Sequence, residues 1–331
     1  MTDSHDDLYP LEFQPVLKDY PWGGRAIGTR LGRSVPAGPV AESWEISAHP
    51  SGPTPVRNGH FQGRDLAWLQ RRFGESLVGR VNRQALDRGA FPLLIKLLDA
   101  REWLSVQVHP DDDYATTHEN DLGKTEMWVV LAAEAGAEIL LGFQSGVEAE
   151  DFRRALERGE VEGCLHRTPA RPGDVFFVSP GTIHAIGPGV LLAEIQQSSN
   201  VTYRVYDWNR VPERALHIDH SLAVLDFEAT ELSAVVPEPL TSPGAELLAE
   251  CPRFRTERII LTAGDELGGN LDGDSFEIWG AMAGSVNLEG GNRSIELRGV
   301  SWALLPAAIG PFRMRCTQDT TLLRILTPPA A

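Results

Sequence analysis

Apolar and polar residues alternate along residues 104–109, just before a proline. Successive side chains of a β-strand point to opposite faces, so this pattern predicts a strand with one apolar and one polar face. The expected apolar face consists of Leu104, Val106 and Val108. The expected polar face consists of Ser105, Gln107 and His109. Taken alone, the pattern is typical of a half-buried strand whose polar face meets water.

Other segments of the first two thirds of the chain also predict short elements. Residues 65–73 predict a helix with Asp65 as its N-cap, and a second helical piece is expected near residues 81–88. Residues 148–158 begin acidic and end basic, which indicates an exposed helix. The polar segment 110–123 predicts a loop. Strands are expected at residues 91–98, 127–131, 138–143, 175–178, 190–196 and 201–205.

From Phe254 onward, short apolar segments alternate with glycine turns, which predicts an all-β barrel or jelly roll. A weak repeat indicates two related barrels, with chance similarity as the alternative. Gly173 precedes a strand and His184 follows 11 residues later, whereas Gly310 stands 11 residues after Gly299. The second barrel would therefore lack a ligand. Its expected strands are residues 257–261, 275–283, 285–288, 301–305 and 322–326.

The composition narrows the classes of partner and compartment. A net charge of −16 over 331 residues argues against nucleic acid and anionic membrane as partners. No apolar run approaches the roughly 20 residues of a membrane span, and residues 1–7 lack the pattern of a secretory signal. Three cysteines lie far apart, which is typical of reduced thiols. We therefore expect a cytoplasmic protein. Composition does not distinguish a monomer from a homodimer, and both stay open.

Only three of the 30 basic residues are lysine, namely Lys18, Lys96 and Lys124. Lys96 interrupts an apolar run, and Lys124 lies two residues before Glu126, hence on the same face of an extended segment. A lysine retained among so many arginines suggests a role that a bulkier guanidinium cannot fill. Chance placement is the alternative.

Gln107, His109, Glu126 and His184 form a candidate metal site. Two imidazoles, one carboxylate and one amide oxygen suit Zn²⁺ or a similar ion. With a single anionic ligand, such a site keeps positive charge, which favours a Lewis acid over a purely structural ion. Each residue alone is more often an ordinary polar side chain, so the prediction rests on all four together.

These residues lie in motifs that resemble the type I mannose-6-phosphate isomerases, most closely their short bacterial form. The resemblance spans roughly residues 10–330. The segments that carry it are 107–112 (Gln-Val-His-Pro-Asp-Asp), 123–128 (Gly-Lys-Thr-Glu-Met-Trp), 181–185 (Gly-Thr-Ile-His-Ala), 194–204 (Glu-Ile-Gln-Gln-Ser-Ser-Asn-Val-Thr-Tyr-Arg), 46–50 (Ile-Ser-Ala-His-Pro) and Lys18 with Trp22-Gly23-Gly24.

The resemblance implies a mainly β fold of two cupin-type jelly rolls with a few short helices. Residues 1–236 are expected to form the catalytic domain, with a helical element at 65–88, and residues 237–331 a metal-free second domain. It also implies one zinc per chain, held by the four candidate ligands, and the interconversion of mannose 6-phosphate and fructose 6-phosphate through an enediol. The implied catalytic residues are Lys96, Lys124, Glu194 and Arg204, and the implied substrate-binding residues are Lys18, Trp22 and Ser105.

Two features depart from the usual pattern of the family or of a simple cupin. Asn200 stands where the family often has aspartate. If that aspartate is the proton-transfer base, Glu194 or a metal-bound water must serve here, and Glu194 is our candidate. Arg204 is expected to hold phosphate or to stabilise the enediolate, because its guanidinium is a planar fork of donors. The 17 positions between His109 and Glu126 suit the isomerases rather than a simple cupin.

Two other functions remain open from the sequence alone. One is a different metal-dependent cupin enzyme, such as an oxygenase, which would prefer redox-active iron. The other is a non-catalytic protein that senses a sugar phosphate and has lost turnover.

Overall fold

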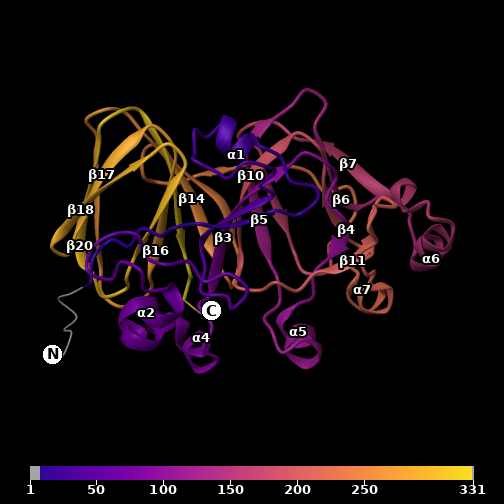
Figure 1. The fold of residues 1–331 in the computed structure, drawn as a ribbon, viewed down its shortest axis with the longest axis horizontal. Helices are drawn as coiled ribbons and strands as arrows, with labels where there is room; N and C mark the ends of the chain where they lie inside the picture. The colour runs from indigo at the N-terminus through magenta and orange to yellow at the C-terminus, as the bar shows by residue number, and fades with distance from the viewer. Residues whose placement is uncertain (1–7, 330–331) are drawn as a thin grey trace. The chain divides into compact units, whose positions relative to one another are not determined.

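The computed structural model describes residues 8–329, which form mainly β-strands (Figure 1). Within this range the longest helix has 10 residues, and none is long and apolar enough to cross a membrane. The helices are α1 (Ala26–Thr29), α2 (Leu66–Phe73), α3 (Glu75–Val78), η2 (Arg80–Asn82), α4 (Arg83–Asp87), α5 (Asp112–His118), α6 (Ala149–Arg158), η3 (Val161–Cys164) and α7 (Ile218–Val224).

Two sheets form the first barrel. One has six strands in the order β1-β2-β3-β10-β5-β8, and the other has five in the order β11-β4-β9-β6-β7. The strands are β1 (Val16–Lys18), β2 (Glu42–Ile46), β3 (Leu93–Ala100), β4 (Val106–Val108), β5 (Glu126–Ala133), β6 (Glu138–Phe143), β7 (Leu165–Pro169), β8 (Val175–Val178), β9 (His184–Ile186), β10 (Val190–Gln197) and β11 (Tyr203–Tyr206).

Two further sheets form the second barrel, drawn in orange and yellow (Figure 1). Their orders are β12-β13-β14-β21-β16-β19 and β15-β20-β17-β18. The strands are β12 (Glu238–Pro239), β13 (Ala245–Glu250), β14 (Arg255–Leu261), β15 (Glu266–Leu271), β16 (Glu277–Ala283), β17 (Ser285–Gly290), β18 (Arg293–Arg298), β19 (Ser301–Leu305), β20 (Gly310–Cys316) and β21 (Thr320–Leu326).

Apolar side chains from both sheets of the first barrel meet between them. Trp128 and Leu192 come from the six-stranded sheet, and Ile139 and Ile186 from the five-stranded sheet. Burial of such side chains contributes roughly 1.5–3 kcal/mol each, so this core fixes how the two sheets face each other. Trp279 and Met314 belong to the corresponding apolar core between the two sheets of the second barrel.

The five-stranded sheet of the first barrel is apolar on its outer face as well. Val106 and Val108 of β4 pack there with Phe152 of α6, and Leu222 of α7 lies against the same cluster. Figure 1 shows both helices beside β4, β6 and β11. Because the outer face is covered, the alternate residues of β4 point toward the barrel interior.

The described residues divide into two compact units. One comprises residues 8–16, 44–95 and 236–329, and the other comprises Leu17–Ser43 and Lys96–Val235. Every residue of the candidate site lies in the second of these units. The range expected to form one domain, residues 1–236, is thus distributed over both units, and its boundaries stay a prediction.

Most predicted elements of the first barrel are present. Asp65 caps α2 by accepting from the Trp68 N–H at 2.6 Å, and α6 and β3 lie within two residues of their predicted positions. The predicted loop 110–123 was wrong in part, because it contains α5. Asp111 caps this helix by accepting from Tyr114 N–H at 2.9 Å.

The two-faced strand at residues 104–109 is shorter than predicted. Regular strand begins at Val106, and Leu104 does not share a face with Val106 and Val108. Leu104 instead belongs to the core between the two sheets. Most of the strand's polar face is also withdrawn from water, since Ser105 is 4% and His109 1% exposed, whereas Gln107 is partly exposed.

Candidate metal centre and active-site cavity

His109, Glu126 and His184 meet inside the first barrel. Glu126 and His184 are the first residues of β5 and β9, and His109 directly follows β4. Their donor atoms all lie within 4.8 Å of one another, and each residue is at most 1% exposed. Gly181 has φ +85°, where a Cβ would approach Val224 O to 2.9 Å, and it donates to His109 O at 2.9 Å. This glycine turn therefore joins the segments that carry the two histidines.

The hydrogen bonds of the histidines determine which ring nitrogen is available. His109 Nδ1 lies 2.9 Å from Val201 O, and His184 Nδ1 lies 2.9 Å from Thr182 O. A carbonyl only accepts, so each Nδ1 carries the proton and each Nε2 keeps a lone pair. Those Nε2 atoms lie 3.7 Å (His109) and 3.4 Å (His184) from the Glu126 carboxylate. All three donors thus converge.

Burial sets the charge of this group. It lowers the pKa of His184 to about 4 and holds the pKa of His109 well below its ordinary value, with Lys124 adding to the effect. Burial also raises the pKa of Glu126 to about 7, against the pull of Lys124. Both Glu126 oxygens are buried; among the described residues Oε1 has no hydrogen-bond partner, and Oε2 faces the Lys124 ammonium at 2.9 Å. Two neutral imidazoles and a buried carboxylate form a donor set that fits a divalent cation.

Gln107 lies against the same group from β4. Its Nε2 is 3.1 Å from His184 Nε2 and 3.4 Å from His109 Nε2. Ser105 Oγ donates to Gln107 Oε1 at 3.3 Å. Oxygen and nitrogen of an amide exchange by a flip, so this amide can present its oxygen to a cation. Gln107 thus lies within reach of both histidines, and its part as a fourth ligand stays a prediction.

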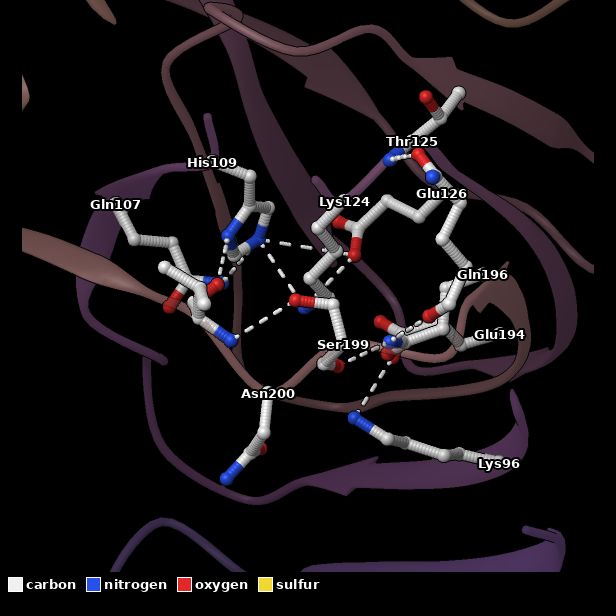
Figure 2. Close-up of polar contacts among 12 residues, drawn as sticks. Lys96, Gln107, His109, Lys124, Thr125, Glu126, Glu194, Gln196, Ser199 and Asn200 are labelled. Atoms are coloured by element: carbon white, nitrogen blue, oxygen red, sulfur yellow. Dashed lines mark hydrogen bonds and ion pairs between the residues drawn. The ribbon is translucent and has the colours of Figure 1, made fainter. Parts of the chain in front are cut away.

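Lys124 lies between the cluster and the cavity. Its Nζ is 2.9 Å from Glu126 Oε2 and 3.2 Å from His109 Nε2 (Figure 2). The side chain is 6% exposed. A compact ammonium thus touches the donor set directly, as its position two residues before Glu126 indicated.

A second buried ion pair adjoins the first. Lys96 Nζ lies 3.3 Å from Glu194 Oε1 and 3.9 Å from Glu42 Oε2, and Trp128 Nε1 donates to Glu194 Oε2 at 3.1 Å. Burial alone lowers the pKa of Lys96, but the carboxylates of Glu42 and Glu194 raise it above its ordinary value. Burial opposes ionisation of Glu194, yet Lys96 and Lys124 bring its pKa below the ordinary value. Both partners are therefore charged at neutral pH.

Beside these groups lies a cavity of about 250 Å³. Gln107 and Lys124, which contact the cluster, are part of its wall. The lining also includes Arg204 and Arg214, whose mutual repulsion adds to burial in lowering the pKa of Arg204. The full lining is Tyr20, Trp22, Glu42, Lys96, Leu98, Leu104, Ser105, Gln107, Lys124, Ile186, Glu194, Asn200, Thr202, Arg204 and Arg214.

The arginine side of the cavity carries excess positive charge. Asp207 is 7% exposed and binds both Arg210 Nη1, at 2.8 Å, and Arg214 Nε, at 2.7 Å. This buried carboxylate pairs with two guanidinium groups, and Arg210 also lies 3.8 Å from the exposed carboxylate of Glu102. Arg204 Nη1 donates to the carbonyl of Ala215 at 2.7 Å, and its buried Nε has no partner among the described residues. Lys96 and Lys124, by contrast, each face a carboxylate directly.

The cavity contains most of the predicted substrate-binding and catalytic residues. Trp22 and Ser105 line it, but Lys18, the last residue of β1, does not. Asn200 also lines it and is exposed, and its amide points away from His109 and Glu126 (Figure 2).

Sequence reasoning missed Glu42, Trp128 and Arg214. Strand alternation from Glu126 could have placed Trp128 on the inner face. Nothing local marks Glu42 or Arg214, because each reaches the cavity through long-range folding.

Comparison with known proteins decides the family. A family model described as the catalytic domain of type I phosphomannose isomerase matches residues 11–130. Mannose-6-phosphate isomerase ManA of Bacillus subtilis is 35% identical over 313 residues, covering 92% of this chain and 95% of that protein. The chain belongs to the type I phosphomannose isomerase family.

Two further comparisons agree with this family. A mannose-6-phosphate isomerase of Streptococcus mutans is 43% identical over 220 residues, covering 65% of this chain and 67% of that protein. The crystal structure of the mannose 6-phosphate isomerase from Bacillus subtilis matches with a TM-score of 0.85 and 31% identity, covering 96% of this chain and 99% of that one. The expected phosphomannose isomerase fold is confirmed over nearly the whole chain.

Proposed function

We propose that this protein is a metal-dependent aldose–ketose isomerase that interconverts mannose 6-phosphate and fructose 6-phosphate. One observation carries the proposal: the buried His109–Glu126–His184 group adjoins a cavity whose lining also includes Arg204 and Arg214. A sugar phosphate needs both features, an electrophile at its carbonyl end and cations at its phosphate end. The relatives named above carry this activity in their names, which agrees with the geometry.

The metal in this proposal is one Zn²⁺ per chain, held by His109, Glu126, His184 and Gln107. Neutral imidazoles and one carboxylate suit this borderline ion. When bound, the ion supplies Lewis-acid stabilisation of negative charge on the substrate oxygens. Ser105 orients the Gln107 amide, and Lys124 brings a second positive charge to the same place.

Arg204 and Arg214 bind the phosphate in this proposal. A phosphate dianion is attracted most where cations exceed carboxylates, and that is the arginine side of the cavity. A guanidinium binds phosphate oxygens through paired donors, so two of them define both position and orientation. This arrangement places the sugar chain between the arginines and the metal ligands.

Glu194 transfers the proton between C2 and C1 in this proposal, and Lys96 supports it. Isomerisation takes a proton from C2 of the aldose and delivers it to C1, while a hydroxyl proton moves from O2 to O1 through a cis-enediol. Glu194 lines the cavity and is ionised, so it accepts the C2 proton. The adjacent Lys96 ammonium balances its charge, and Trp128 fixes its direction. The lowered pKa of Glu194 makes it a weak base, which the metal's stabilisation of the enediolate compensates.

The remaining expectations complete the proposal. The protein works in the cytoplasm as a monomer or homodimer, and the second barrel binds no metal. Among residues 8–329, a single group of histidine and acidic side chains meets the geometry for an ion, which supports one ion per chain.

The test is a coupled assay of fructose 6-phosphate formation from mannose 6-phosphate with Zn²⁺-loaded protein. We expect turnover with the phosphorylated sugar and far slower turnover with mannose. Equal rates on the two sugars would contradict phosphate binding by the arginines. Absence of turnover with any divalent ion, together with tight binding of the sugar phosphate, would favour the sensing function. Oxygen consumption that depends on Fe²⁺ would favour an oxygenase.

A further inference from the structure

Arg204 lies on β11, which is the edge strand of the five-stranded sheet. On its inner side β11 pairs with β4, and Arg204 stands opposite the candidate ligand Gln107. On its outer side no further strand follows. An edge strand leaves main-chain groups that must find partners elsewhere when they are removed from water. The position of Arg204 therefore depends on what satisfies this outer edge.

Residues 215–217, just before α7, form hydrogen bonds with this outer edge at Arg204. The His217 N–H donates to Arg204 O at 2.8 Å, and the Arg204 N–H donates to His217 Nδ1 at 3.1 Å. Ala215 O accepts from Arg204 Nη1 at 2.7 Å. Residues 215–217 thus bind the carbonyl, the amide and the guanidinium of the same arginine. Of the three groups that residues 215–217 contribute to these bonds, only the imidazole of His217 is a side chain.

The imidazole of His217 does not cap α7, although His217 is the N-cap residue of that helix. Its side chain makes no capping bond, and the first turn is closed by Ser221, whose N–H and Oγ both donate to His217 O at 2.8 Å. An N–H donor requires a lone pair on Nδ1, so the ring is neutral and carries its proton on Nε2. Protonation of Nδ1 removes the acceptor and places two donors face to face.

We infer that His217 is a positioning residue for Arg204, holding it for substrate phosphate only while the imidazole is neutral. This inference rests on the proposed function. It assigns to the isomerase a residue outside the cavity wall, which acts through Arg204 rather than by touching the substrate. It also predicts that substrate affinity falls in acid.

The surroundings of His217 determine the direction of that pH dependence. Burial lowers the pKa of His217, the charges of Arg204 and His220 lower it further, and Glu119 after α5 raises it. Tyr203, with its ring 6.2 Å from His217, donates its hydroxyl to Glu119. Because the net shift of the pKa is downward, the Arg204 bond is intact at neutral pH. It is lost as the pH falls below the ordinary histidine range.

Two substitutions at His217 distinguish the loss of the hydrogen-bond acceptor from the loss of the group that titrates. In His217→Asn, Oδ1 stands two bonds from Cβ, as Nδ1 does, and accepts without titrating. His217→Leu has a similar branched shape and no acceptor. At pH 8 we expect His217→Leu to raise KM for mannose 6-phosphate about tenfold, with kcat changed less than about threefold, because uniform binding is lost. His217→Asn should stay within about threefold of the parent in KM.

Two further readouts exclude a general structural effect. The slow rate on unphosphorylated mannose should be the same in His217→Leu and parent. The ratio of KM at pH 5.5 to KM at pH 8 should be smaller in His217→Asn than in the parent. Protonation of the substrate phosphate affects both proteins equally, so it cancels from this comparison. His166→Leu is the matched control, because His166 lies on β7 at the opposite edge of the same sheet. It should behave as the parent does.

The outcomes are distinct from those of the proposed function. A parent protein with no isomerase activity would contradict the function itself. An active parent with an unchanged KM in His217→Leu would overturn the role of His217. Equal losses on mannose and its phosphate would overturn it too, since they indicate a disturbed fold. If His217→Leu does not fold, identical pH profiles for parent and His217→Asn would overturn the pH-dependent role.

Discussion

Each barrel contains a buried glutamate at an equivalent strand position, and the two glutamates have different partners. In both, an inner strand begins with glutamate and carries tryptophan two residues later, as Glu126 and Trp128 on β5 and as Glu277 and Trp279 on β16. The strand orders β3-β10-β5-β8 and β14-β21-β16-β19 place β5 and β16 at equivalent positions. Glu126 is a candidate metal ligand, and Glu277 is its counterpart in the second barrel. Among the described residues, the second barrel has no group that could hold an ion.

The difference lies in the cation that faces the carboxylate. Residue 194, opposite Trp128 on β10, is glutamate, whereas Arg324 stands opposite Trp279 on β21. Arg324 binds Glu277 through Nε at 3.0 Å and through a second, shorter contact, and Trp279 Nε1 donates to Glu277 Oε2 at 2.7 Å. An internal guanidinium therefore satisfies Glu277. In the first barrel two histidines and the Lys124 ammonium face Glu126 instead. The imidazoles place lone pairs beside the carboxylate, which a guanidinium cannot do, so this group can bind a divalent cation.

The largest expected difference concerns metal content. His184→Ala removes one of two imidazoles from the donor set, so tight binding of Zn²⁺ should be lost and isomerase activity should fall at least about a thousandfold. Elemental analysis after chelation and refilling should give one ion per parent chain and none for the variant. Two ions per parent chain would break the comparison, because the second barrel would then hold one.

The next effect separates chemistry from metal binding. Glu194→Gln keeps the shape of the side chain and its bond from Trp128 but removes the proton acceptor. We expect kcat to fall about a hundredfold or more, with zinc content unchanged. An unaltered kcat would show that another group carries the proton, and a loss of zinc would show that Glu194 supports the ligands instead.

Smaller losses are expected from the two cavity lysines. Arginine in place of Lys96 or Lys124 preserves charge, but the guanidinium is larger and each site is at most 6% exposed. Each substitution should lower kcat/KM at least about tenfold, or ~1.4 kcal/mol, while zinc content stays that of the parent. Lys18→Arg is the matched control, since Lys18 does not line the cavity. Full activity in both inner variants would contradict a special role for lysine.

The smallest effect belongs to the second barrel. Arg324→Met leaves Glu277 buried without its guanidinium, which should reduce the free energy of unfolding by about 2 kcal/mol, below the value for a fully buried pair because Arg324 is partly exposed. Activity and zinc content should not change. Denaturant titration of this variant and of Arg313→Met, an exposed arginine on β20, measures the difference. Equal stabilities would show that the arginine does not replace a cation at Glu277.

Local pattern located the candidate ligands of the first barrel better than it located the residues around them. Glu126 and His184 were identifiable because each starts a strand bounded by a turn, and the repeat correctly set Gly310, the first residue of β20, against His184, the first of β9. Leu104 was misplaced because alternation was extended past the true start of β4. The helix α5 was missed although Asp111 has the residue type of an N-cap.

The rest of the site depends on contacts between distant residues. Trp128 meets Glu194 across 66 positions and Gln107 meets His184 across 77, so no window of sequence contains either pair. The role of His217 depends on β11 being an edge strand, a property of sheet order rather than of local sequence. Family resemblance identified Lys96, Glu194 and Arg204 as a set, but only folded geometry relates Arg214 to Asp207 and Arg204 to His217.

Trp128 gives the first barrel an optical property that follows from its place. Its ring centroid lies 5.4 Å from that of His184, and its N–H is bonded to Glu194. The indole therefore experiences the electric fields of the metal-binding group and of the proton-transferring pair at once. In a variant whose other seven tryptophans are replaced by phenylalanine, the emission wavelength of Trp128 should register a change of charge at either the candidate metal group or the Lys96–Glu194 pair.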